Sequence, residues 1–330
     1  MTHNIQRRNF NLLALAGAVA SSLGSLSAWA QAAWPSRPIR MIIPSTPGGG
    51  TDFTGRQISM KLTEMNGWQV VPDNRPGAGT ALGLAEAARA KPDGYELVIA
   101  QSDNVSLIPL LMKVTYDPLK DLTPIALAAI TPLIIIVRDD SPFKTLADLI
   151  KVARAKPGQL SYGTSGTGGS VHIAMELLQI TAGCKMQHVP YKGSTPALAD
   201  LMGGHLNFAG SSISSAATLI HAGKIRALAV TSASRNASLP DVPTVAEFGY
   251  KDFNAISFYG VMGPAGLPAP IVARLNADVN RIIARPDVKA AFLAQGFDAT
   301  AMSPEEFGAL IKADIQKSRE IIAAASIKVE

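Results

Sequence analysis

The feature that most constrains this chain is a unit that occurs twice: an apolar strand, a glycine-rich loop and then an amphipathic helix. The first copy spans residues 41–65 and the second spans 160–181. Around them, further apolar β-rich runs alternate with helical patterns, which predicts α/β layering with largely parallel sheets. A length of 330 residues suits about two domains. We therefore expect one glycine-rich loop in each domain.

The pattern places the individual elements. In the helix at 52–65, Ile58, Leu62 and Met65 form one apolar stripe. The last helix follows a capping box, Ser303-Pro304-Glu305-Glu306, with proline at its first position. Strands are predicted at 39–43, 95–100, 133–137, 160–163, 186–189, 206–209, 225–231 and 258–262, and helices at 52–65, 80–90, 145–155, 170–181, 195–202, 214–222, within 268–284 and from 304.

Composition excludes several classes of protein. With 47% apolar and 17% charged residues the chain is globular rather than disordered. The net charge is +5, to which Arg7 and Arg8 contribute two, and basic runs are absent, which argues against nucleic-acid binding. The single cysteine, Cys184, cannot form an intramolecular disulfide, and no Cys/His cluster has zinc-site spacing. We expect no metal and no cofactor.

The first 32 residues have the pattern of an export signal. Arg7-Arg8 precede an apolar stretch at 12–26 and small residues at 28–32. This predicts a removable signal peptide at 1–32, with twin-arginine and Sec routes both open and cleavage near Gln31 or Ala33. The next longest apolar run, 125–137, is shorter than the ~20 residues of a membrane span. The mature protein is expected to be soluble outside the cytoplasm.

The first glycine-rich loop, at 44–52, joins a strand to a helix. Three consecutive glycines free its backbone, and the helix N-terminus offers N–H donors and about half a positive charge. This is typical of a carboxylate or phosphate site that needs no lysine. The alternative is a tight turn in which Asp52 caps the helix.

The second loop, at 162–170, has four glycines and four serine or threonine side chains at the same kind of junction and is the richer candidate anion site. It nearly matches a phosphate loop, but Gly169 stands where the lysine is required. Phe53 and Val171 break the dinucleotide pattern G-x-G-x-x-G, and Thr167 breaks G-x-S-x-G. Nucleotide hydrolysis, dinucleotide binding and serine hydrolysis therefore lose support.

Four other polar residues remain open between two roles. His172, just inside the helix after the second loop, either packs internally, which we favour, or donates to a ligand. Asp103 is either a polar contact or a turn residue. Lys192 is more simply a solvated lysine than a carboxylate partner, and Arg75 more simply part of a fixed turn than a clamp.

Taken together, six stretches resemble the periplasmic solute receptors of the tripartite tricarboxylate transporters, the Bug receptor family. They are WPSRPI at 34–39, PGGGTD at 47–52, NRPGAG at 74–79, PDGY at 92–95, VPYKG at 189–193 and LPDVPT at 239–244. The resemblance covers essentially the whole mature chain. It implies an α/β fold of the periplasmic-binding-protein type, a two-domain Venus flytrap with a ligand cleft between domains. Domain 1 would comprise 33–128 and 253–330, and domain 2 would comprise 129–252.

In these receptors backbone N–H groups and hydroxyls of both loops hold a ligand carboxylate. Two departures stand out: Ser45-Thr46 replace an aromatic residue and a proline, and 209–212 lack a common acidic residue. Carried over by motif, the ligand-binding residues would be Ser45, Gly49, Thr51, Asp52, Thr164, Ser165, Gly168, Ser170, Gly193 and Ser194, to which we add Asp103.

The predicted function is a monomeric, non-enzymatic periplasmic receptor that delivers a small organic carboxylate to a membrane permease of the tripartite tricarboxylate type. Neither loop offers an arginine, so one or two carboxylates fit better than three. A dicarboxylate with an aliphatic or aromatic body is favoured. The alternatives are a ligand sensor for a membrane signalling partner and, with less support, an α/β hydrolase, since the loop hydroxyls have no recognisable base or orienting acid.

Overall fold

The computed structural model describes residues 34–328. The predicted signal peptide lies outside the described residues. From Ile39 onward, the described chain forms one structural unit. Among the helices described, none combines the length and the apolar character needed to cross a membrane.

The first lobe is built on a mixed sheet in the order β2-β1-β3-β9-β4. β2 and β3 flank β1 in parallel, whereas β9 runs antiparallel to both β3 and β4. Its strands are β1 (Ile39–Ile43), β2 (Val70–Asn74), β3 (Glu96–Gln101), β9 (Ile256–Pro264) and the first part of β4 (Leu122–Arg138), with β10 (Asp298–Ala299) paired to β4. Its helices are α2 (Gly50–Asn66), α3 (Ala81–Ala88), α4 (Ile108–Leu111), α9 (Ala269–Ala284), α10 (Pro286–Leu293) and α11 (Pro304–Ala325).

The second lobe continues from the other end of β4 in the order β4-β7-β5-β6, with β8 also paired to β4. β5 is parallel to β6 and β7, and β4 is antiparallel to β7 and β8. The strands are β5 (Ser161–Thr164), β6 (Gln187–Pro190), β7 (Phe208–Ser212) and β8 (Ile225–Val230), and the helices are α5 (Leu146–Ala155), α6 (Ser170–Ala182), α7 (Ser194–Met202) and α8 (Ile213–His221).

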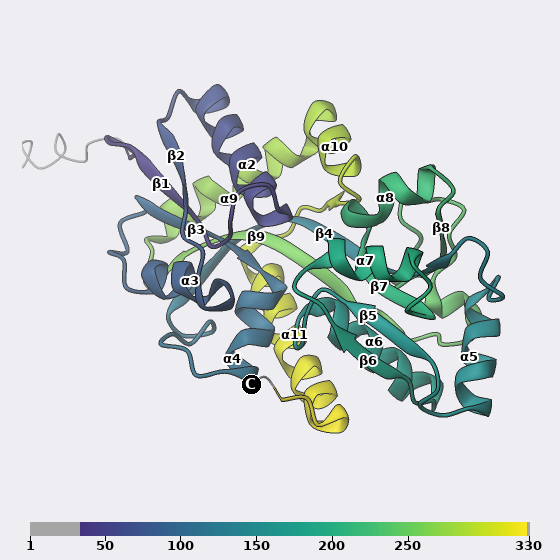
Figure 1. Ribbon diagram of the computed structural model, residues 1–330. Helices are drawn as coiled ribbons and strands as arrows, with labels where there is room; N and C mark the ends of the chain where they lie inside the picture. Colours follow the sequence, from purple (N-terminus) through teal and green to yellow (C-terminus); the bar gives the residue numbers. More distant parts are fainter. Residues whose placement is uncertain (1–33, 329–330) are drawn as a thin grey trace, which may run out of the picture. The chain divides into compact units, whose positions relative to one another are not determined.

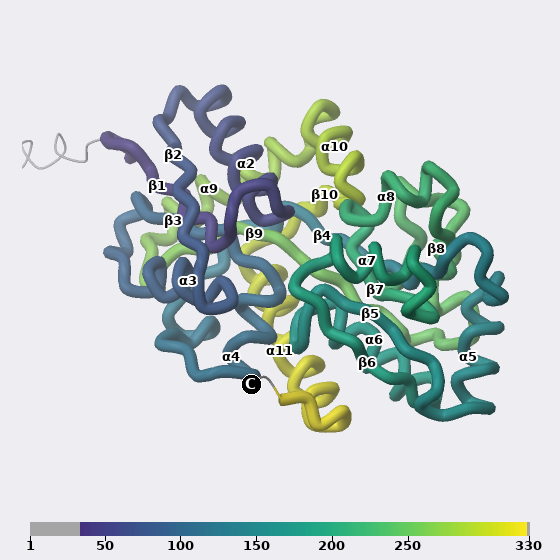
Figure 2. The backbone as a smooth tube through the Cα atoms, viewed as in Figure 1, coloured from purple at the N-terminus to yellow at the C-terminus, as the bar shows by residue number. Residues whose placement is uncertain are grey.

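One long strand joins the two lobes. β4 pairs with β9 from Leu122 to Pro132 and with β7 and β8 from Leu133 onward, so it belongs to both sheets (Figure 1). The last helix, α11, returns to the first lobe, where Phe307 and Ile311 join its apolar core. Figure 2 shows this yellow helix running past both α4 and α6. A smaller apolar cluster of Leu107, Ile173 and Ile321 links the first lobe, α6 and α11.

The sequence predicts single elements more accurately than it predicts the direction of the strands. The strand at 39–43 is confirmed residue for residue, and Ser303 with Glu306 forms the predicted capping box at α11. The prediction of largely parallel sheets is wrong, because β4 and β9 run antiparallel to their neighbours. The run at 133–137 is only the last part of a 17-residue strand, which continues without interruption through Pro132. The register shifts in the β4–β9 pairing lie nearer the start of β4, between Pro124 and Ala126 and between Leu127 and Ala129.

Candidate functional site

The first glycine-rich loop places the N-terminus of α2 at Gly49. Hydrogen bonding within the helix begins with the N–H of Phe53, which donates to the Gly49 carbonyl at 2.9 Å. The N–H groups of Gly50, Thr51 and Asp52 precede that first bond and point out of the helix end. This end of α2 therefore carries the donors that a carboxylate requires.

Asp52 holds this loop together from inside. Its Oδ2 accepts the Gly48 N–H at 3.0 Å, and its Oδ1 accepts from Arg56 Nε at 2.8 Å and from Asn74 Nδ2 at 2.9 Å. Burial alone would raise the pKa of Asp52, but these hydrogen bonds outweigh it and lower the pKa. The side chain is 7% exposed and its oxygens are engaged, so we assign Asp52 a positioning role in the loop.

Three further features shape the space beside this loop. A Cβ on Gly50 would lie 2.7 Å from the Tyr259 hydroxyl and 2.8 Å from Phe297 Cζ, so the loop packs directly against β9 and the segment before β10. The Thr51 hydroxyl donates to Gln101 Oε1 at 2.7 Å. Ser45 Oγ is buried and, among the residues described, has no hydrogen-bond partner.

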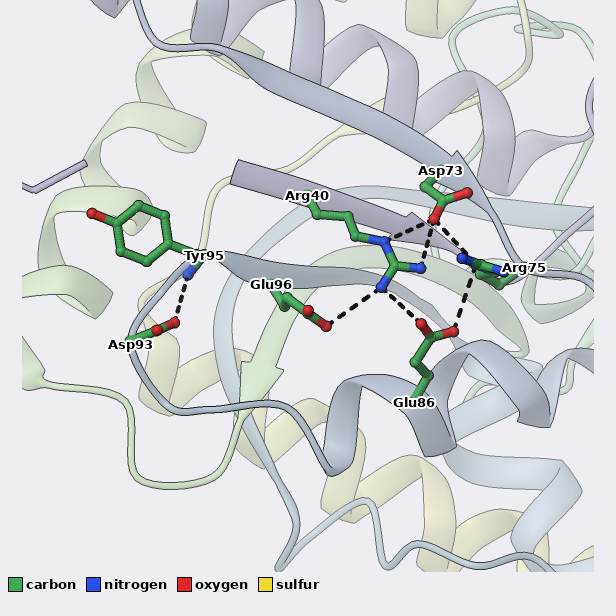
Figure 3. Close-up of polar contacts among 7 residues, drawn as sticks. All are labelled: Arg40, Asp73, Arg75, Glu86, Asp93, Tyr95 and Glu96. Atoms are coloured by element: carbon green, nitrogen blue, oxygen red, sulfur yellow. Dashed lines mark hydrogen bonds and ion pairs between the residues drawn. The ribbon is translucent and has the colours of Figure 1, made fainter. Parts of the chain in front are cut away.

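Two arginines of the first lobe, Arg40 and Arg75, are already paired with carboxylates. Figure 3 shows Arg40 on β1 between Asp73, Glu86 and Glu96, at 2.6, 2.7 and 3.5 Å. Arg75, which follows β2, lies 3.1 Å from Asp73 and 3.7 Å from Glu86. Two guanidinium groups thus share three carboxylates. This agrees with a structural role for Arg75 rather than a clamp on a ligand.

The second loop is braced by a pair of histidines. The buried Gly168 N–H donates to His172 Nδ1 at 3.0 Å, and the His172 ring stacks on His188 with ring centroids 3.8 Å apart. His188 Nε2 is hydrogen-bonded to Thr164 Oγ1 at 2.7 Å. His172 is only 5% exposed, as expected for internal packing, and its Nε2 lies 3.6 Å from Glu176.

These contacts have electrostatic consequences. Burial, with a smaller contribution from the charge of His172, lowers the pKa of His188 to about 4. The ring is therefore neutral at physiological pH. Thr164 is fully buried, and its hydroxyl donates to the Gly166 carbonyl at 2.9 Å. Thr164 and Gly168 accordingly support the loop from behind, whereas the neighbouring Ser165 is exposed.

The N-terminus of α6 is occupied by a carboxylate of the chain itself. Asp103 follows β3 in the first lobe, and its Oδ1 accepts the Ser170 N–H at 3.2 Å and also the Ser170 hydroxyl. Ser102 Oγ lies 3.2 Å from Ser170 Oγ and 2.7 Å from Ser257 Oγ on β9. The end of β3 therefore meets the second loop directly.

A cavity of about 170 Å³ lies at this junction. It is bounded by Ser102 and Leu107 from the first lobe, Ser170 from the second, and Asp314 and Lys317 from α11. The first loop does not line it. Burial raises the pKa of Asp314 to about 6 and lowers the pKa of Lys317.

The structure thus brings most of the predicted site residues to two helix ends and separates their roles. Gly193 donates its N–H to the Ser165 carbonyl at 3.2 Å and, with φ of 108°, is the N-cap of α7; Ser194 is the first residue of that helix rather than its side-chain cap. Sequence reasoning missed the residues beside the loops, namely Gln101, Ser102, Ser257 and Tyr259, and the bracing role of His188 behind the second loop. The polar stretch at 101–106 was the one available signal.

Comparison with known proteins identifies relatives along the whole chain. Residues 54–327 match the family model described as the tripartite tricarboxylate transporter family receptor. The chain is 39% identical over 321 residues, 97% of this chain and 94% of the relative, to a protein encoded in the tcbD-tcbE intergenic region of Pseudomonas sp. (strain P51).

Two solved structures are also similar. One, described as a periplasmic transporter, is 35% identical with a TM-score of 0.77, over 90% of this chain and all of the other. The other, Rpa4515 of R. palustris with adipate, is 32% identical with a TM-score of 0.78, over 89% of this chain and 99% of the other. They confirm the two-domain α/β fold of periplasmic binding proteins. The chain belongs to the tripartite tricarboxylate transporter receptor family.

Proposed function

We propose that this protein is a periplasmic receptor that binds a small organic carboxylate between its two lobes. The observation that carries the proposal is the Asp103–Ser170 contact. It places a carboxylate on the N–H and hydroxyl donors at the start of α6, which is the chemistry a ligand carboxylate would use there. The N-terminus of α2 offers donors of the same kind in the first lobe.

The two loops approach one another through a short series of contacts. Tyr259 packs against Gly50 of the first loop. The pKa of Tyr259 is raised, chiefly by burial and in part by the negative charge of Asp103. Asp103 in turn meets Ser170 of the second loop. A ligand that reaches both helix ends would carry two carboxylates, and the adipate in the relative from R. palustris is such a molecule. A dicarboxylate is therefore our first candidate class.

The family also supports a transport role. We propose that the protein works outside the cytoplasm as a monomer after removal of residues 1–32, and presents its ligand to a permease of the tripartite tricarboxylate type. N-terminal sequencing of periplasmic material should give a start near Gln31 or Ala33. An intact Met1 would contradict export with cleavage. Loss of transport in a strain that lacks the permease alone would support delivery over sensing.

A thermal-shift screen tests the binding function. A ligand that binds only the native state raises stability by RT ln(1 + [L]/Kd), so mono-, di- and tricarboxylates, aromatic acids and amino acids can be ranked together. We expect organic carboxylates to raise the melting temperature. The best one should be recovered unchanged after incubation with the protein. Chemical conversion of that compound would favour the hydrolase alternative, and no stabilisation by any carboxylate would refute the proposal.

A further inference from the structure

The carboxylate of Asp103 lies at the place that the second loop would otherwise offer to a ligand. Its Oδ1 takes both donors of Ser170, the first residue of the 13-residue helix α6. Its Oδ2 faces Gly169, where an added Cβ would be 3.6 Å away. Asp103 belongs to the first lobe and Ser170, 67 residues later, to the second, so this contact joins the two lobes.

The backbone beneath Asp103 is firmly held. Asp103 begins a π-helical turn, Asp103–Leu107, in which the Asn104 side chain accepts the Gln101 N–H at 2.9 Å. The Tyr116 hydroxyl donates to the Asn104 carbonyl at 2.6 Å, and Val105 and Leu107 are buried. Asp103 therefore extends from a packed support rather than from a free loop.

No cation neutralises this carboxylate within residues 34–328. Burial raises the pKa of Asp103 and outweighs the two hydrogen bonds from Ser170, which lower it. The other ionisable groups that face it are Tyr259 on β9 and Asp314 on α11, and both have pKa values raised in part by its charge. A second anion at this place would meet the like charge of Asp103 itself.

From this geometry we infer that Asp103 determines ligand specificity, because it fills the α6 anion site with the chain's own carboxylate, and a ligand's second carboxylate must displace it. The inference rests on the proposed carboxylate-binding function. A monocarboxylate held by the first loop alone leaves the Asp103–Ser170 contact in place. A dicarboxylate has to break that contact, and so loses part of the affinity that its second charge would provide.

Binding calorimetry on the mature chain tests this with adipate and hexanoate, which have the same number of carbons but differ by one carboxylate. Asp103→Asn keeps the side-chain size and removes the charge. We expect it to raise the affinity for adipate at least tenfold and to change that for hexanoate less than threefold. Asp139→Asn, which removes an exposed carboxylate paired with Arg226, is the matched control and should change neither. Asp103→Ala should reproduce the selective gain if asparagine disturbs folding.

An unchanged or reduced preference for adipate in both Asp103 variants would overturn the inference, and loss of adipate binding would make Asp103 a ligand contact instead. A separate measurement needs no ligand. The amide proton of Ser170 should shift upfield in the NMR spectrum of ligand-free Asp103→Asn, because a charged acceptor has been removed. If no carboxylate binds the wild-type protein, the proposed function fails and with it the competition. The amide shift then still decides whether Asp103 occupies the end of α6.

Discussion

The two glycine-rich loops have the same local design, but the carboxylate that accepts hydrogen bonds from each loop comes from a different part of the chain. In the first, the internal carboxylate is Asp52, three residues into the helix, and it binds the loop N–H of Gly48 from behind. In the second, the carboxylate comes from Asp103 in the other lobe and binds at the front of the helix. The first loop is therefore braced with its helix end left open, whereas the second is braced by histidines and its helix end is occupied.

This difference shows that a glycine-rich strand–helix junction specifies backbone donors but not what accepts from them. Gly168 has its N–H directed to His172, and Ser170 has its N–H directed to Asp103. The sequence alone does not show whether these N–H groups bond to a side chain of the protein or to a ligand. The three-dimensional structure shows that His172 and Asp103 accept from them. The two loops should consequently respond differently to pH, to added bulk and to loss of a hydroxyl.

The largest expected difference is in acid. The pKa of His188 falls from 6.5 to about 4 on folding, so its neutral form stabilises the second lobe fully above pH 6.5, and this stability is lost as the pH falls towards 4. The shift corresponds to at most about 3 kcal/mol. Asp52 has a lowered pKa, so the first loop loses its support only below the ordinary aspartate range near 3.8. Hydrogen exchange between pH 7 and 4 should show loosening around 164–172 before 48–52.

The control for this prediction is His188→Gln, which cannot be protonated. The variant should flatten the dependence of the unfolding free energy on pH between 6.5 and 4. Asp314 acts in the opposite direction, because its pKa is raised to about 6 and its stabilising effect is lost as pH rises from 3.8 towards 6. The comparison of wild type and variant cancels that contribution. Equal slopes in both proteins would contradict a role for His188.

Added bulk should separate the loops next. Gly50→Ala places a Cβ 2.7 Å from the Tyr259 hydroxyl and 2.8 Å from Phe297, so we expect a loss of about 1–3 kcal/mol in the free energy of unfolding. The change at the last glycine of the second loop, Gly169→Ala, meets Asp103 Oδ2 at an ordinary 3.6 Å and at a φ of −79°, and should cost less than about 0.5 kcal/mol. Urea unfolding of the two variants measures both. Equal destabilisation would mean that the first loop does not pack on β9 as described.

The fold was predictable where local patterns decide it. The capping boxes at Thr145 with Asp148 and at Ser303 with Glu306 fix two helix starts from four residues each. Strand direction depends instead on which distant strand becomes the neighbour, and no local pattern encodes that β3 pairs with β9 some 160 residues later. The prediction of largely parallel sheets failed for this reason. The short strand β2, with Pro72 and Asp73 in its five residues, gives too weak a β pattern to be found.

The candidate site divides in the same way. The two helix ends and their glycines follow from composition and spacing, so Gly49 and Ser170 were found from the sequence. What lies opposite them was not, since Asp103 reaches Ser170, and Tyr259 reaches Gly50, only through the folding of the two lobes around β4 and β9. The sequence is compatible with Asp103 as a polar contact or as a turn residue, and the structure shows a polar contact with Ser170.

The smallest expected effect separates two adjacent hydroxyls of the second loop. Thr164 is fully buried and bonded to His188 and Gly166, so Thr164→Ala should lower the unfolding free energy by about 1 kcal/mol, the usual contribution of such a bond. Thr164→Ser retains the hydroxyl and should recover most of that loss. Ser165 is exposed, so Ser165→Ala should leave stability unchanged and weaken carboxylate binding by about 1 kcal/mol if its hydroxyl reaches the ligand. Calorimetry and urea unfolding on the same samples give both numbers. Full affinity in Ser165→Ala would confine the second loop's contribution to the end of α6, where Asp103 competes for it.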